Sequence, residues 1–277
     1  MAGTRTVGVI GAGNVSDALV RGFLARGVVA PERCIVTNRG NDVRLARFAR
    51  QWSVVTTRDK ARLVRDANVV VLAVKPSDVP GVLAEIAPHI GAHHLVISVA
   101  AGVTLATLEE CCGAAAVVRA MPNTSSAVGA SATAICGGRL AGERELAIAR
   151  ELFEAVGRVV VVPERHFDAV TGVSGTGPAY VYLLAEAMVE AAEREGLDRS
   201  VAIELVMQTV LGAGRMLVET GEDPAVLRAR VTSPNGTTMA AMEVLTKEGF
   251  VATMGRAIAR ATQRAGELRG TPPVRAR

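Results

Sequence analysis

The sequence of 277 residues has few aromatic side chains, only 3%, although 49% of its residues are hydrophobic. Ala, Val and Leu must therefore fill the core, which suits helices packed on a sheet and on one another. The formal charge is only +4, and the basic residues are scattered without aromatic residues between them. We therefore expect no nucleic-acid partner, whereas anionic small molecules fit a mildly basic chain. The length allows one large domain or two ordinary ones.

Metal-binding patterns, disulfide patterns and long apolar runs are also lacking. The four cysteines show no C-x-x-C spacing and no histidine pair accompanies them, so we expect neither a metal site nor a disulfide framework. His89, His93 and His94 fall at a helix–strand junction that we expect to face solvent. A strand pattern begins within a few residues of the start, leaving no room for a signal peptide, and no apolar run reaches the roughly 18 residues of a membrane span. These absences predict a cytoplasmic protein that does not enter membranes.

A glycine turn near the start organises the rest of the chain. The apolar run 7–10 is followed by Gly11 and Gly13, and then by apolar residues at helical spacing. In this strand–turn–helix context, G-x-G-x-x-G predicts a dinucleotide site, with Gly11 for the sharp turn and Gly13 for close approach of a pyrophosphate. Ser16 replaces the third glycine and is small enough for close packing. The alternative is a buried hairpin with flexible glycines.

Strand and helix patterns then alternate along the first half of the chain. This alternation, with nearly pure apolar strands, predicts a Rossmann-type, doubly wound parallel sheet. The expected strands are 34–39, 53–56, 68–74, 95–103, 116–124, 131–136 and 158–162, and the expected helices include 42–51, 58–67 and 143–156.

The tip of the second strand indicates which cofactor binds. An acidic residue there would bind the ribose hydroxyl of NAD, whereas an arginine suits the 2′-phosphate of NADP. Asn38 and Arg39 occupy the tip, and no carboxylate follows until Asp42. Arg39 is therefore the candidate phosphate ligand, and we expect NADPH to be preferred over NADH. A solvated surface arginine is the alternative.

The pattern changes near Pro163, after which 167–268 contains no strand pattern. We therefore expect a dinucleotide-binding domain at 1–163, an all-α domain at 164–270 and a disordered tail at 271–277. Long helices are predicted at 179–197 and 200–221, and the second is apolar nearly all the way round. Such a helix is most simply buried by a second subunit, although a compact monomeric bundle is the alternative.

Two stretches of the helical half, predicted as loops, carry the remaining polar groups. They are SGTGPAY at 174–180 and VTSPNGTTMAA at 231–241. A helix that starts with Thr hydroxyls and free N–H groups can hold a carboxylate, although ordinary N-capping gives the same pattern. No Ser-His-Asp set accompanies them. A reaction without a strong acid or base needs an electrophile that is already activated, such as a protonated imine, and hydride transfer to it needs mainly positioning.

Together these stretches resemble the pyrroline-5-carboxylate reductase family. The matching segments are GVIGAGN at 8–14, VTNR at 36–39, AVKP at 73–76, SVAAGV at 98–103, RAMPNT at 119–124, DAVTGVSGTGPAY at 168–180, ETGEDP at 219–224 and VTSPNGTT at 231–238. The resemblance implies reduction of 1-pyrroline-5-carboxylate to L-proline by NADPH or NADH. It also implies a homodimer with interleaved C-terminal helices, which can assemble into a decamer, and a 231–241 segment that serves the other subunit's cofactor.

The resemblance also implies the site residues. The cofactor would be lined by Ile10, Gly11, Ala12, Gly13, Asn14, Val15, Asn38, Arg39, Ala73, Val74, Lys75, Pro76, Val99, Ala100, Ala101 and Asn123. The substrate would meet Glu164, Ser233, Gly236, Thr237 and Thr238, with the Thr238 hydroxyl bonded to the ring nitrogen.

Departures from the family pattern leave other functions open. Ser125 follows MPNT where proline is frequent, Asn235 replaces a glycine, and Ala229 stands where aspartate is common. Asn tolerates positive φ, so the turn can form, but its side chain bears on the choice of substrate. One alternative is a reductase of another cyclic imine acid, such as a piperideine carboxylate, and another is a non-catalytic NADPH-binding regulator. A hydroxyacid dehydrogenase of the same architecture is disfavoured. Such enzymes rely on a positioned lysine for proton transfer, and no lysine lies between Lys75 and Lys247.

Overall fold

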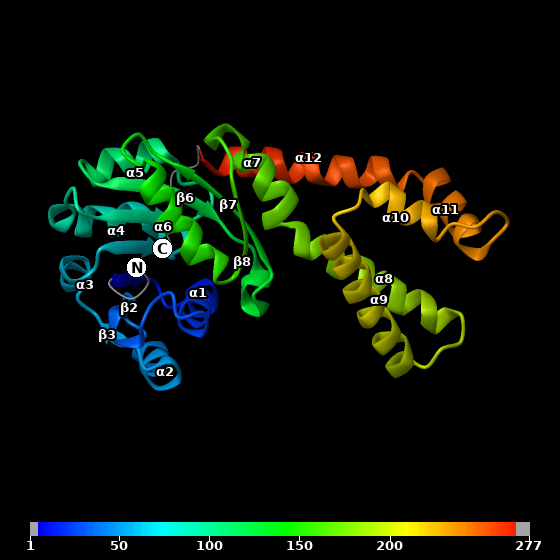
Figure 1. Cartoon of the computed structure of the whole chain (residues 1–277), viewed down its shortest axis with the longest axis horizontal. Coiled ribbons are helices and arrows are strands. Elements are labelled where there is room, and N and C mark those ends of the chain that lie inside the picture. The colour runs from blue at the N-terminus through cyan, green and yellow to red at the C-terminus, as the bar shows by residue number, and fades with distance from the viewer. Residues whose placement is uncertain (1–4, 270–277) are drawn as a thin grey trace, which may run out of the picture. The chain divides into compact units, whose positions relative to one another are not determined.

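The computed structural model describes residues 5–269, so the tail predicted at 271–277 lies outside the described residues. The chain divides into two compact units (Figure 1). The first runs to Thr176 and takes in the chain again from Arg260, and the second is Gly177–Ala259. Each unit is described by itself.

The first unit is built on one eight-stranded sheet with the order β3-β2-β1-β4-β5-β6-β7-β8. All neighbouring strands are parallel except β6 and β7, which are antiparallel. The predicted Rossmann-type fold class is confirmed, with the last two strands reversed relative to the other six. The strands are β1 (Val7–Ile10), β2 (Cys34–Thr37), β3 (Val55–Thr57), β4 (Val69–Leu72), β5 (Leu95–Ser98), β6 (Ala116–Met121), β7 (Ser131–Gly137) and β8 (Gly157–Val161).

Helices cover both faces of this sheet, which explains why its central strands are mainly apolar. Along β4, Val69 and Val71 pack into one core while Val70 and Leu72 pack into the other. The first core takes α1 (Asn14–Ala25), α2 (Asp42–Trp52) and α6 (Glu143–Glu154), and the second takes α3 (Lys60–Asp66), α4 (Val79–Ile86), α5 (Leu105–Cys112) and α7 (Phe167–Val170). Short 3-10 turns are formed by Pro31–Arg33, Pro76–Asp78, Ala87–His89, Thr124–Val128 and Glu164–His166.

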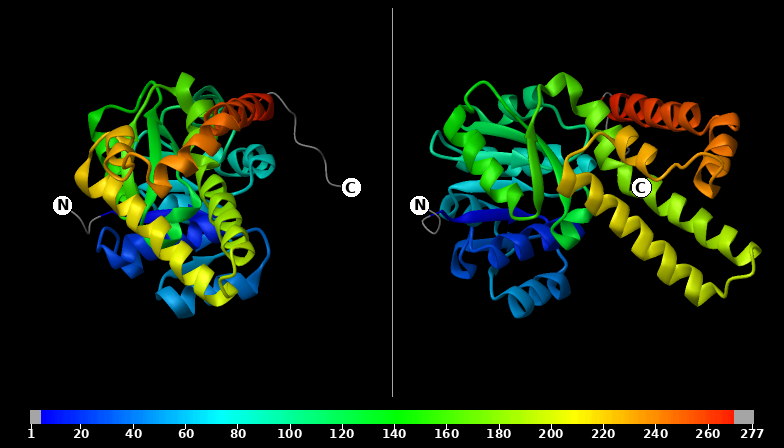
Figure 2. Two further views of the ribbon diagram at one scale, coloured as in Figure 1. Left: turned by 90° about the vertical axis from the view of Figure 1, so that its right-hand side faces the viewer. Right: turned by 45° about the vertical axis from the view of Figure 1, so that its right-hand side comes forward.

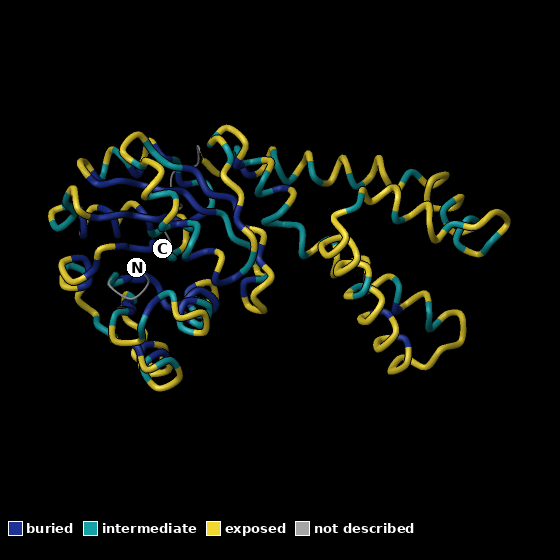
Figure 3. Tube along the Cα trace, in the orientation of Figure 1, coloured by how far each residue is buried: buried dark blue, intermediate teal, exposed yellow. Residues whose placement is uncertain are grey.

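The second unit is entirely helical in the residues described, as predicted. Its helices are α8 (Gly177–Arg194), α9 (Arg199–Thr220), α10 (Pro224–Arg230), α11 (Thr237–Lys247) and the first part of α12 (Phe250–Arg269). The first two lie side by side (Figure 2) and bury Ala185, Val189, Ala202 and Val206 between them. Most of their remaining length is exposed in the single chain (Figure 3).

Three expectations about local structure were wrong. We expected no stretch that is apolar over the length of a membrane span, but α9 is long and apolar enough to cross a membrane by length and composition. One such helix is weak evidence for a membrane span. The stretch 174–180 is no loop, because a π-helical turn at Thr171–Gly175 leads directly into α8. His94 is buried: its Nδ1 accepts a hydrogen bond from Gly91 N at 2.9 Å, and its Nε2 lies 3.0 Å from Val64 O.

Candidate functional site

The glycine turn is held between the ends of β2 and β4. Gly11 N donates to Thr37 O at 2.8 Å, and Ala73 N donates to Ile10 O at 2.9 Å. Gly11 has a φ of +118°, and a Cβ there would lie 2.2 Å from the carbonyl oxygen of Ala73. Only glycine satisfies both constraints, so the neighbouring backbone itself requires Gly11.

No backbone conformation and no contact within residues 5–269 requires a glycine at position 13. It is the N-cap of α1 with φ −90°, and a Cβ there would meet no atom within 4 Å. It provides no side-chain cap, so the N–H groups of the first turn of α1 remain available to an anion. Ser16 is fully buried, which confirms that it is small enough to replace glycine, although its Oγ has no hydrogen-bond partner within residues 5–269.

A cavity of about 550 Å³ runs along the carboxyl ends of β1, β2 and β4. Ligands of such sheets bind at this edge. The predicted cofactor residues that line it are Ile10, Gly11, Ala12, Gly13, Asn38, Arg39, Ala73, Val74 and Lys75. The other predicted cofactor residues do not line it: they are Asn14, Val15, Pro76, Val99, Ala100, Ala101 and Asn123.

Charged side chains line this groove, and apart from Arg39 and Lys75 we did not predict them as site residues. Arg39 Nη1 lies 3.6 Å from Asp78 Oδ1, and the Arg39 side chain is 89% exposed. Lys60 Nζ lies 2.8 Å from Glu85 Oε2, and both line the same cavity. Arg44 is a further cation in the lining. The groove thus has cationic groups beside the glycine turn, as an anionic ligand needs.

The predicted residues at the ends of β5 and β6 have other contacts. Val99 N donates to Leu72 O at 3.1 Å, and Ala100 is buried. The Asn123 side chain accepts from Ser125 N at 3.0 Å and donates to Ser174 O at 3.1 Å, so it joins the end of β6 to the π-helical turn. Contact of these residues with a cofactor remains a prediction.

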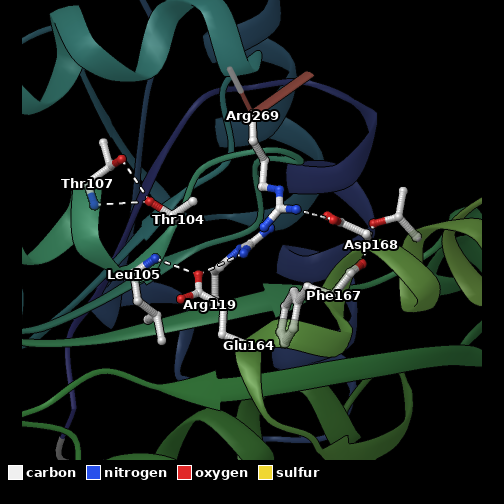
Figure 4. A network of polar contacts seen from close by, with 9 residues as sticks. Thr104, Leu105, Thr107, Arg119, Glu164, Phe167, Asp168 and Arg269 are labelled. Atoms are coloured by element: carbon white, nitrogen blue, oxygen red, sulfur yellow. Dashed lines mark hydrogen bonds and ion pairs between the residues drawn. The ribbon is translucent and has the colours of Figure 1, made fainter. Parts of the chain in front are cut away.

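Glu164, predicted at the substrate edge, lies in a network that links β6, α5 and α7 (Figure 4). Its Oε1 accepts from Arg119 Nη1 at 2.8 Å and from Leu105 N at 2.7 Å. Arg119 is 3% exposed, and its guanidinium lies 4.6 Å from the centre of the Phe167 ring. Glu164 therefore neutralises a buried cation and caps the start of α5. Its contact with substrate stays a prediction.

Burial makes three of the cysteines poorly suited to nucleophilic chemistry. Cys136 lies opposite Arg119 in the sheet, and burial raises the pKa of its thiol to about 12. Burial also raises the thiol pKa of Cys34 and Cys112 to about 12. A neutral thiol is a poor nucleophile, so a mechanism through a thiolate is disfavoured at these positions.

The predicted substrate residues other than Glu164 form a turn and a helix start in the second unit. Gly236 N donates to Ser233 O at 3.0 Å, and Asn235 takes a φ of 58°. This confirms that asparagine can form the turn. Gly236 is the N-cap of α11 and supplies no side-chain cap, so the first-turn N–H groups, including those of Thr237 and Thr238, remain open to a ligand. Binding of a carboxylate at this helix start stays a prediction.

Known proteins match nearly the whole length of this chain. Residues 164–268 match the family model of pyrroline-5-carboxylate reductase dimerisation, and residues 6–102 match that of NADP oxidoreductase, coenzyme F420-dependent. The pyrroline-5-carboxylate reductase 2 of Bacillus subtilis is 39% identical over 266 residues, covering 96% of this chain and 95% of the relative.

Solved structures agree with this placement. A pyrroline-5-carboxylate reductase from Coxiella burnetii superposes with a TM-score of 0.91 at 40% identity, covering 97% of this chain and 100% of that one. A Plasmodium falciparum pyrroline carboxylate reductase with NADP bound has a TM-score of 0.85 at 26% identity, with coverages of 96% and 99%. This chain belongs to the pyrroline-5-carboxylate reductase family.

Proposed function

We propose that this protein reduces 1-pyrroline-5-carboxylate to L-proline by hydride transfer from NADPH or NADH, as the last step of proline biosynthesis. Family membership over nearly the full chain supports this reaction. The observation that carries it is the cofactor groove beside the glycine turn, together with an uncapped helix start at Gly236 in the second unit.

The residues of the chain mainly position the reactants. The backbone N–H groups of Gly236, Thr237 and Thr238 would receive the substrate carboxylate, with Ser233 nearby and Glu164 at its edge. The Thr238 hydroxyl would hydrogen-bond the ring nitrogen and fix the orientation of the imine. The nicotinamide cofactor, when bound, supplies the hydride. Because a protonated imine is already electrophilic, the site needs no thiolate and no histidine base.

The cofactor would lie along the groove of the first unit. The turn from Ile10 to Val15 would hold the pyrophosphate, and Asn38 and Arg39 would face the adenosine ribose. Arg39 would bind a 2′-phosphate through paired hydrogen bonds, which gives the preference for NADPH. The segments 73–76 and 99–101, with Asn123, would line the remainder.

The assembly and location belong to the same proposal. A dimerisation domain spans 164–268, and we propose a cytoplasmic homodimer whose C-terminal helices interleave, with further assembly into a decamer. The functional division would fall at 163/164, with 164–270 as the dimerisation and substrate domain. The 231–241 segment would then serve the cofactor of the other subunit.

The reaction is tested by oxidation of NADPH and NADH with the five-membered imine acid and its six-membered analogue. Thr238→Ala should lower kcat at least about tenfold while the Kd of NADPH stays unchanged, because one charge-assisted hydrogen bond is lost. Thr246→Ala, at an exposed position on the same helix, is the matched control. An unchanged rate in Thr238→Ala would remove that residue from the site. Turnover of the six-membered imine alone would reassign the substrate, and NADPH binding without any turnover would indicate a regulatory relative.

A further inference from the structure

A second cavity, of about 390 Å³, lies at the tip of β2. It is lined by Ala12, Asn38, Arg39, Gly40, Asn41 and Arg44, and so by two arginines and no carboxylate. We propose that Arg44 is a second specificity-determining residue for the cofactor, and that with Arg39 it forms a two-arginine site for the phosphate monoester on the adenosine ribose. This inference rests on the proposed binding of NADPH in the adjoining groove.

The position of Arg44 on α2 directs its side chain toward the glycine turn. It lies in the first helical turn, where its backbone N–H donates to the cap residue Asn41 Oδ1 at 2.9 Å. Side chains on a helix lean toward its N-terminus, so this guanidinium extends back to Ala12. Its Nη1 lies 3.5 Å from Ala12 O, which is long for a hydrogen bond and leaves its donors available.

Arg44 differs from the arginines near it in having no ion pair with a carboxylate of residues 5–269. One turn further along α2, Arg47 pairs with Asp17 at 3.0 Å. Asp42, at the start of the helix, pairs with Arg58. Arg44 has no carboxylate within ion-pair distance among residues 5–269, and a cation in the first turn opposes the helix dipole. The charge of Arg44 is therefore unfavourable to α2 and suits an external anion.

Arg39 is held loosely on the other side of the cavity. Its pair with Asp78 is 3.6 Å long and its side chain is 89% exposed, so the pair is weak and a phosphate can replace the carboxylate. Between the two arginines the loop is fixed by Asn38, whose Oδ1 accepts from Gly40 N at 3.0 Å and from Asn41 N at 2.9 Å. Asn38 thus fixes the backbone of the loop between Arg39 and the start of α2.

The chemistry of such a site selects between the two cofactors. A phosphate monoester carries a charge of about −1.5 to −2 at neutral pH, and two guanidinium forks can bind its oxygens in pairs. The corresponding ribose hydroxyl of NADH is neutral and gains little from a second cation. Arg44 should therefore act on the 2′-phosphate and hardly on the rest of the cofactor.

Calorimetric titration without any imine tests this independently of the reaction. The probes are adenosine 2′,5′-bisphosphate and 5′-AMP, followed by NADPH and NADH. Arg44→Ala should raise the Kd of the bisphosphate and of NADPH about tenfold, and those of 5′-AMP and NADH less than about twofold. Arg44→Lys should recover part of the loss, because charge is kept without the planar fork. Arg50→Ala, on the same helix but outside the cavity, should change nothing.

Two results would overturn the assignment. An equal rise in Kd for all four ligands in both Arg44 variants would mean that Arg44 shapes the loop and does not contact the phosphate. Unchanged affinity in Arg44→Ala would place the phosphate elsewhere. The proposed reaction can fail separately: phosphate selectivity that depends on Arg44, without turnover of any imine acid, would keep this inference and refute the reaction.

Discussion

Gly13 offers a sharp test of where the pyrophosphate lies, because the protein does not need a glycine there. Its φ of −90° is open to alanine, and a Cβ would meet no protein atom within 4 Å. Alanine is a poorer N-cap by about 0.5–1 kcal/mol, and it recovers about 0.4–1 kcal/mol by restricting the unfolded chain. The two effects nearly cancel, so the Tm of Gly13→Ala should move by no more than about 1–2 °C.

Cofactor affinity should respond very differently. A methyl group in that open space would separate the backbone N–H groups from the pyrophosphate, and the Kd of NADPH in calorimetry should rise about tenfold or more, equivalent to about 1.4 kcal/mol. Gly11→Ala is the contrasting variant, because its φ of +118° and the 2.2 Å approach to Ala73 O should lower the Tm as well. Wild-type NADPH affinity in a folded Gly13→Ala protein would refute this placement of the pyrophosphate.

Other parts of the structure give further expectations. Glu164→Ala leaves the buried Arg119 without its carboxylate and should cost about 2–3 kcal/mol of stability, less than a fully buried pair because Glu164 is part-exposed. Thermal unfolding at one protein concentration measures it, and a wild-type Tm would contradict it. Ser16→Ala removes a buried hydroxyl that has no hydrogen-bond partner within residues 5–269, and it should stabilise the protein by about 1 kcal/mol. A lower Tm would show that the hydroxyl is bonded. Cys111 is the one cysteine that is not buried, so it alone should react with a thiol reagent in the folded protein. Burial and Glu110 raise its pKa, so its labelling rate should still climb at a pH where a free thiol has already reached its plateau, and a plateau at the same pH as the free thiol would contradict the shift.

The sheet could be predicted from the sequence because its physics is local. Strands buried on both faces are expected to be apolar, as all four residues of β4 and the first three of β5 are. The reversal of β7 was missed, although a cue existed. The chain between Met121 and Ser131 is shorter than the dozen or so residues that a parallel crossover needs, and it holds only a 3-10 turn. Counting the residues of that connection would have predicted an antiparallel pair.

The charged lining of the cofactor groove could be predicted only in part. Arg39 was found because it directly follows a strand end, where the fold fixes the location of a side chain. Lys60 and Glu85 come from two different helices, and only tertiary packing brings them to the groove. His94 was expected at the surface because periodicity does not show that its two ring nitrogens find backbone partners. The sequence did contain a cue for the proposed role of Arg44, because a cation in the first turn of a helix opposes the helix dipole.

The helices α8 and α9 of the second unit leave many apolar side chains exposed in the single chain. The α8–α9 core consists of four residues, while Leu205, Met207 and Leu211 on α9 are each about half exposed in the single chain. Burying one such side chain is worth about 1.5–3 kcal/mol, so leaving many exposed forgoes much of the energy that keeps a long helix folded. The match of 164–268 to a dimerisation domain therefore supports the proposed homodimer, in which a second copy would cover the exposed apolar side chains of α9. In the proposed homodimer the stability of α9 would depend on protein concentration, because folding of the helix and formation of the interface would be coupled.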